Sequence, residues 1–120
     1  MERQILKSQH DLLVEMTEKY AWLSHVQYGV GNAIALRDLC GISGIKNREL
    51  RLQIESVRRE GLAICTDGGG YFFPENFNQY KKWADLEGRR ARSILKTVAA
   101  SYRHFSHFVD LKGVKILWRG

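Results

Sequence analysis

The chain has 120 residues, 44% of them hydrophobic and 27% charged, which is the composition of one ordinary globular domain spanning residues 1–120. Its net charge of +6 favours anionic partners, with nucleic acid as the first candidate, although a small protein can carry such a charge only for solubility. No stretch approaches the roughly 20 apolar residues of a membrane span, and the N-terminus lacks a signal-peptide core, so we expect a cytoplasmic protein without a membrane partner.

Residues 1–26 are predicted to form an N-terminal helix. One face of this helix carries residues spaced four and three apart: Gln9, Leu13, Met16, Tyr20 and Leu23. Such an amphipathic face can pack on the core, on a C-terminal helix or on a second chain, and the sequence leaves the three open. Two glycines in residues 27–32 then indicate a loop.

A short helix is predicted next, because Leu36, Leu39 and Cys40 have the spacing of one buried helix face. Gly41 is expected to end it in a left-handed conformation. Asn47 is expected to cap the following helix with its side chain. The turn from Gly41 to Asn47 is then longer than the three or four residues of a usual helix-turn-helix.

The second helix of this pair is predicted to run to about Glu60, with Gly61 as its stop. At about 100° per residue, Leu50, Ile54 and Val57 share a narrow core face. The arginines are sorted to one flank of that face, with Glu55 among them: Arg48, Arg51, Arg58 and Arg59.

A β-hairpin is predicted after this helix. Two apolar, β-prone runs, residues 62–66 and 71–73, flank a glycine-rich turn, and Pro74 ends the second strand. Ile34 can add a short third strand. The order of two helices and a hairpin in residues 33–74 predicts a mainly α protein with a small β-hairpin wing (α+β), a winged helix-turn-helix with long N- and C-terminal helices.

Residues 75–108 are predicted to form one long helix of about 45 Å, which is longer than the winged core needs. A homodimer is the simplest explanation, and folding back along the first helix is the alternative. The proposed dimer interface is a heptad-like series: Tyr80, Ala84, Ala91, Ile94, Val98 and Phe105. Lys82, Arg89 and Arg92 form either a cationic row on one side of this helix or an ordinary solvated face. The tail 109–120 is either an edge strand or a docking segment.

Several runs of the sequence match the pattern of one known family: Asn32-Ala33-Ile34, Leu36-Arg37-Asp38-Leu39, Arg48-Glu49-Leu50-Arg51, Arg58-Arg59-Glu60-Gly61, Ile64-Cys65, Gly70-Tyr71-Phe72-Phe73-Pro74-Glu75 and Arg89 to Leu95. Over about 70 residues, the chain resembles the small winged-helix proteins of bacterial phages and prophages. The resemblance implies a phage protein that binds DNA in transcription regulation or DNA replication.

Double-stranded DNA is therefore the first predicted partner, bound by helix 47–60 in the major groove. Arginines near the start of this helix are expected to read bases, and the others to contact phosphates. The predicted DNA-binding residues are Lys46, Asn47, Arg48, Arg51, Arg58, Arg59 and Arg37. The acidic wing tip and many aromatic residues support an alternative, in which the chain is a protein-interaction module that binds a host or phage protein.

An enzyme is the least supported function, and we expect no cofactor, metal or small-molecule substrate. His104 and His107 are three residues apart on a helix, but no third ligand stands at a suitable spacing. The two cysteines form no CxxC pair and fit a reducing cytosol. The three consecutive glycines lack the Lys-Ser/Thr of a phosphate-binding loop.

Overall fold

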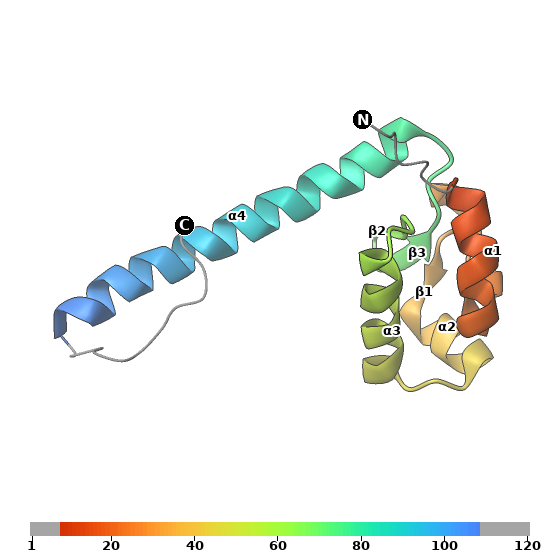
Figure 1. The fold of residues 1–120 in the computed structure, drawn as a ribbon, viewed down its shortest axis with the longest axis horizontal. Coiled ribbons are helices and arrows are strands. Elements are labelled where there is room, and N and C mark those ends of the chain that lie inside the picture. The colour runs from red at the N-terminus through yellow and green to blue at the C-terminus, as the bar shows by residue number, and fades with distance from the viewer. Residues whose placement is uncertain (1–7, 109–120) are drawn as a thin grey trace, which may run out of the picture. The chain divides into compact units, whose positions relative to one another are not determined.

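A computed structural model describes residues 8–108 (Figure 1). They are mainly helical, with one small three-stranded antiparallel sheet, so the α+β class is confirmed. The chain divides into two compact units, Met1–Trp83 and Ala84–Gly120, which we describe separately. The predictions for residues 1–7 and for the tail 109–120 lie outside the described residues.

The N-terminal helix is shorter than predicted. Helix α1 spans Gln9–Lys19, begins at the Ser8 cap and ends at Tyr20, whose backbone is not helical. A tighter 3-10 helix, η1, follows at Ala21–His25. Because the chain changes direction at Tyr20, both Trp22 and Leu23 are buried, with 3% and 1% of their surface exposed. A single straight helix to residue 26 is therefore wrong.

Helix α2 spans Leu36–Ser43, and the prediction that Gly41 ends it was wrong. Gly44 is the residue in the left-handed conformation, with φ of 73°, and its N–H donates to the carbonyl of Cys40. The connection to the next helix is therefore only the three residues 44–46. This is the usual length for a helix-turn-helix, so the expected departure from that motif is absent.

Helix α3 spans Asn47–Arg59, close to the predicted bounds. Its capping position is held by Lys46 and not by Asn47, which is already the first helical residue, and no side chain caps this end. Leu50, Ile54 and Val57 are buried, which confirms the predicted core face. They pack with residues of α1, η1 and α2 in one cluster around the inner side of α3.

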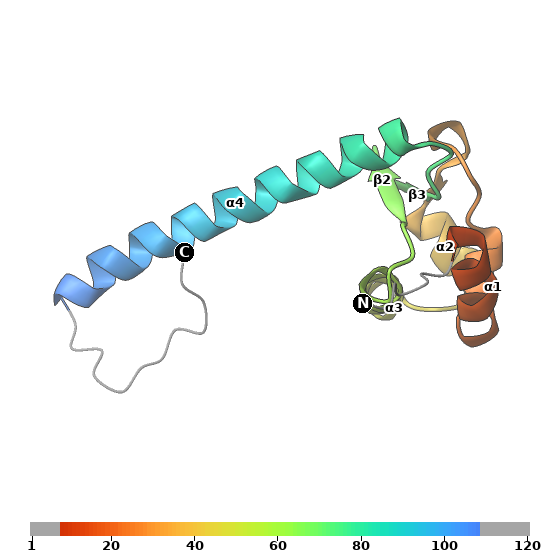
Figure 2. The same ribbon diagram turned by 45° about the horizontal axis from the view of Figure 1, so that its top comes forward.

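The sheet combines strands β1 (Ile34–Ala35), β2 (Cys65–Asp67) and β3 (Gly70–Phe72) in the order β1-β3-β2. Figure 2 shows β2 and β3 side by side. The predicted hairpin and third strand are thus present. Gly68 and Gly69 form the turn, with φ of 59° and 86°. Two successive positive φ angles are the requirement of a tight two-residue hairpin turn, which explains why two glycines stand here.

The loop before β1 is more ordered than predicted. It contains a short 3-10 helix, η2 (Val30–Asn32), and Tyr28 forms a parallel bridge with Phe73.

Cys65, the first residue of β2, is fully buried. This burial raises the pKa of its thiol to about 11, although the positive charge of Arg58 acts in the opposite direction. The thiol is therefore protonated at neutral pH and packs as a small apolar side chain.

Helix α4 spans Phe77–Phe108 without interruption at Gly88. A rise of 1.5 Å per residue makes it about 48 Å long. Among residues 8–108, no helix is both long and apolar enough to cross a membrane.

Candidate nucleic-acid interface

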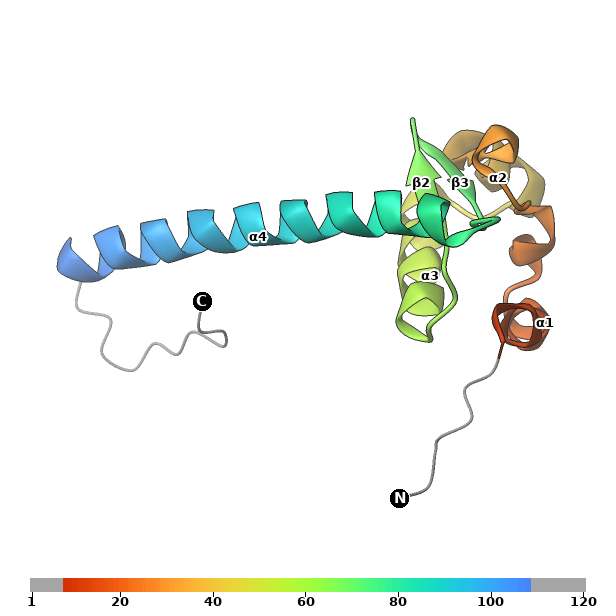
Figure 3. The same ribbon diagram turned by 90° about the horizontal axis from the view of Figure 1, so that it is seen from above.

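The side of α3 turned away from the core carries a row of four residues that we call the outer face: Arg48, Leu52, Glu55 and Arg59. All four are exposed. At about 100° per residue they fall within roughly 60° of one another and lie opposite the core face. Figure 3 shows α3 with the hairpin beside one of its ends. The helix therefore presents two arginines, one carboxylate and one apolar side chain to solvent.

Three further predicted residues are exposed near this face. Arg51 lies on α3 about 40° beyond one edge of the outer face. Lys46 and Asn47 stand at the N-terminal end of the same helix, and Arg37 lies on α2. Within residues 8–108, the cationic groups of Arg37, Lys46, Arg48, Arg51 and Arg59 make no hydrogen bond or ion pair. These five charges can therefore meet an external anion without breaking an internal contact.

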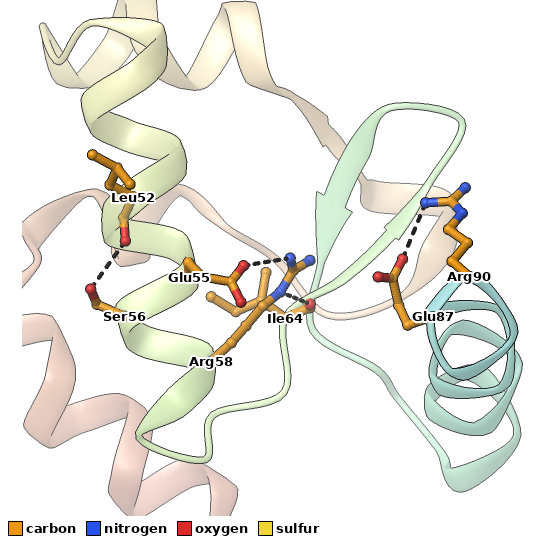
Figure 4. A network of polar contacts seen from close by, with 7 residues as sticks. All are labelled: Leu52, Glu55, Ser56, Arg58, Ile64, Glu87 and Arg90. Atoms are coloured by element: carbon orange, nitrogen blue, oxygen red, sulfur yellow. Dashed lines mark hydrogen bonds and ion pairs between the residues drawn. The ribbon is translucent and has the colours of Figure 1, made fainter. Parts of the chain in front are cut away.

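Arg58 differs from the other predicted DNA-binding residues, because its side chain is only 20% exposed. Its Nε donates to the carbonyl of Ile64 at 2.9 Å, and its guanidinium lies 3.9 Å from Glu55 (Figure 4). The same group lies over the rings of Trp83 and Tyr71, 4.9 and 5.8 Å from their centroids. The structure thus places Arg58 in an internal contact between α3, the hairpin and the start of α4, where it cannot fix a phosphate without leaving these partners.

A second internal contact holds the other flank of α3. The indole Nε1 of Trp22 donates to Oε1 of Gln53 at 2.8 Å, and Nε2 of Gln53 donates to Glu49 at 3.3 Å. Trp22 belongs to η1, so α3 is held to the N-terminal segment on one flank and to the hairpin by Arg58 on the other. A helix fixed on both flanks presents its outer face in a defined orientation.

The hairpin turn offers no positive charge. Asp67, Gly68 and Gly69 are exposed at its tip. Neither glycine has a neighbour within 4 Å of the position where a side chain would begin. Only backbone N–H groups of the turn are therefore available to a phosphate.

The predicted dimer residues all lie on α4. Ile94 and Phe105 are strongly exposed, at 63% and 52%, and Leu95 and Tyr102 beside them are exposed as well. Tyr80 precedes the boundary between the two units and Ala84 follows it, so only the part from Ala84 onward belongs to the second unit. This part has an apolar side at helical spacing, which we call the apolar seam: Ala91, Ile94, Leu95, Val98, Tyr102 and Phe105.

Leu52 and Glu55 were missing from the predicted site. The prediction selected only cations and sorted the residues of α3 by the two flanks of its core face. It therefore left out residues that lie opposite that face. The spacing of residues 48, 52, 55 and 59 was visible in the sequence and identifies the row.

No three potential metal ligands cluster anywhere in residues 8–108. The side chain of His107 is outside the described ones.

No protein-family model matches this chain, and neither a curated protein nor a solved structure shows significant similarity to it. The interface is therefore interpreted from its own geometry.

Proposed function

We propose that the chain is a winged helix-turn-helix protein that binds double-stranded DNA through the major groove. The observation that carries this proposal is the outer face of α3, where Arg48 and Arg59 are exposed and unpaired on a helix held from both flanks. The three-residue connection between α2 and α3 and the hairpin that follows support the same interpretation. From the resemblance to small winged-helix proteins of phages, we also propose a role in transcription regulation or DNA replication.

In this proposal the residues of α3 have different tasks. Arg48 and Arg51 are near the N-terminus of the helix, and a guanidinium can pair with two acceptor atoms of guanine. Leu52 lies between them and Arg59, where an apolar side chain suits the methyl group of thymine. Arg59 and Arg37 contact phosphates, which fix the position of the helix without reading sequence. Arg58 keeps α3 in place and contacts no DNA.

A homodimer formed by the apolar seam of α4 is the second part of the proposal. Ile94, Leu95, Tyr102 and Phe105 are large side chains that solvent would otherwise contact, and their spacing suits a two-helix contact. A symmetric pair would place two copies of α3 on a DNA site with two-fold symmetry.

The basic test is fluorescence anisotropy with random-sequence duplex DNA at low and moderate salt. We expect binding that weakens steeply as salt rises, because counterions are released from the phosphates. A folded protein that fails to bind duplex DNA even at low salt would refute the proposed function.

Replacement of Arg51 by alanine tests the major-groove assignment. On a DNA site selected by the wild-type protein, Arg51→Ala should cost about 1–3 kcal/mol of binding free energy and relax the preference at one base pair. Lys19→Ala, which removes an exposed cation from α1, is the control and should leave sequence preference unchanged. Unchanged affinity and unchanged preference of Arg51→Ala would contradict the assignment.

A protein-interaction module is the second candidate function, and one observation favours it. An open, mainly apolar groove lies between α1 and η1, with Leu13, Val14 and Val26 in its lining. Val14 is 54% exposed there. In a pull-down, the wild-type chain should capture a protein that the Val14→Lys variant no longer captures. That result, together with absent DNA binding, would favour this function over the first.

A further inference from the structure

A second cationic surface lies on α4 within the unit Ala84–Gly120. Four exposed side chains form it, and we call it the basic stripe: Arg89, Arg92, Lys96 and Arg103. At about 100° per residue they fall within roughly 60° of one another. The apolar seam lies on a different side of the same helix, so pairing of two seams would leave the basic stripe exposed.

The charge pattern of this helix is unlike that of an ordinary solvated helix. An exposed helix usually carries acidic and basic residues three or four apart, which stabilise one another. From Gly88 to Phe108 the sequence has five arginines and lysines and no aspartate or glutamate. The fifth cation, Arg90, lies about 100° beyond the edge of the stripe and is paired with Glu87 at 3.3 Å. Arg89 has Asp85 four residues before it, but Arg92, Lys96 and Arg103 have no aspartate or glutamate three or four residues away. Most of the stripe is therefore a row of cations without compensating acids.

The length of the stripe fits a polyanion. Fourteen residue steps separate Arg89 from Arg103, which correspond to about 21 Å along the helix axis. Double-stranded DNA carries about one negative charge per 1.7 Å of its axis, so a cationic row of this length can meet several phosphates. No side chain of the stripe could read bases from such a row without entering a groove, and spaced single charges are sufficient for contacts to the backbone.

We propose that the basic stripe of α4 is a sequence-independent contact surface for the phosphate backbone of nucleic acid. It acts in addition to the outer face of α3. The inference rests on the proposed function, since a protein that binds no nucleic acid has no use for it. It requires no particular arrangement of the two units, because all four residues lie on one helix.

The test measures the salt dependence of binding to random duplex DNA by the full chain. The stripe variant is Arg89→Gln/Arg92→Gln/Lys96→Gln, which removes three charges and keeps good helix-forming residues. Each lost phosphate contact should lower the slope of log K against log salt by about 0.9. Arg90→Gln is the matched control, because it removes a neighbouring arginine outside the stripe, and it should leave the slope unchanged.

The possible outcomes separate this inference from the proposed function. A smaller slope in the stripe variant, with unchanged circular dichroism and with the base preference of a selected site retained, supports the inference. An unchanged slope in a stripe variant that still binds DNA overturns the inference alone. A wild-type protein that binds no DNA overturns both. Loss of binding to vesicles containing phosphatidylserine, with an unchanged DNA slope, would overturn it in favour of an anionic membrane surface.

Discussion

Two neighbouring arginines of α3 have opposite environments. Arg58 is held by the carbonyl of Ile64 and by two aromatic rings, whereas Arg59 is exposed on the outer face. Residues of one type at adjacent positions can thus serve stability in one case and binding in the other. Burial of the guanidinium, and not its charge, makes the difference.

Alanine substitution should separate these two roles. Arg58→Ala is expected to lower the free energy of unfolding by about 2 kcal/mol, because it removes a charged hydrogen bond and stacking on Trp83. Arg59→Ala should change it by less than about 0.5 kcal/mol and should weaken DNA binding. Urea denaturation followed by circular dichroism gives both values. Equal stability of the two variants would contradict the assignment of Arg58 as an internal contact.

The proposed thymine contact of Leu52 can be tested by removing one methyl group from the DNA. In a selected site, replacing each thymine in turn by deoxyuridine should reveal one position where wild-type affinity falls about fourfold, the effect of roughly 0.8 kcal/mol for one buried carbon. Leu52→Ala should bind the two DNAs equally at that position. Val14→Ala, an exposed aliphatic residue on α1, is the control and should retain the wild-type difference. The contact is refuted if Leu52→Ala retains it too.

At the scale of elements, the end of α2 is decided by which glycine adopts the left-handed conformation. Gly41 lies inside the helix with no neighbour within 4 Å of an added Cβ, whereas Gly44 has φ of 73°. Gly41→Ala should therefore stabilise the protein by about 0.5–1 kcal/mol. Gly44→Ala should destabilise it by about 1–2 kcal/mol, the cost of the left-handed conformation for a residue with a Cβ.

Thermal and urea unfolding of the two variants check this pair, and each serves as the control for the other. If Gly41→Ala destabilises the protein and Gly44→Ala leaves its stability unchanged, α2 ends at Gly41 and not at Gly44.

Sequence patterns predicted the elements better than their ends. The glycines at the hairpin and the spacing of Leu50, Ile54 and Val57 are strong local signals, and both were confirmed. The end of α2 was missed because Gly41 and Gly44 are equally able to end a helix, and the tertiary context selects between them. The break at Tyr20 carries no glycine or proline signal; burial of Trp22 and Leu23 provides the reason for it.

The candidate site was only partly visible in the sequence for a similar reason. Exposure of Arg48, Arg51 and Arg59 agrees with the ordinary behaviour of arginine. The position of Arg58 depends on the carbonyl of Ile64 and the ring of Trp83, which are 6 and 25 residues away and are brought near by the fold. No local pattern contains that information.

At the scale of the whole molecule, the apolar seam of α4 predicts the oligomeric state. Ile94→Lys places a charge in the seam and should convert a dimer into monomers, because the charge would be buried without a partner. Ala100→Lys adds the same charge on the opposite side of the helix, about 180° from Ala91, and should leave the dimer intact. Sedimentation equilibrium checks both. Identical masses for the two variants would contradict the seam as the interface.

The contact between Trp22 and Gln53 also gives the protein an internal spectroscopic probe. Trp22 touches α3 from one flank and Trp83 meets Arg58 of α3 from the other, so both described tryptophans lie in contact with the same helix. A shift of α3 would change the polarity and hydrogen bonding around an indole. The wavelength and intensity of tryptophan fluorescence therefore depend on the position of this helix. Binding of a partner to its outer face can be followed by this fluorescence without attaching a dye.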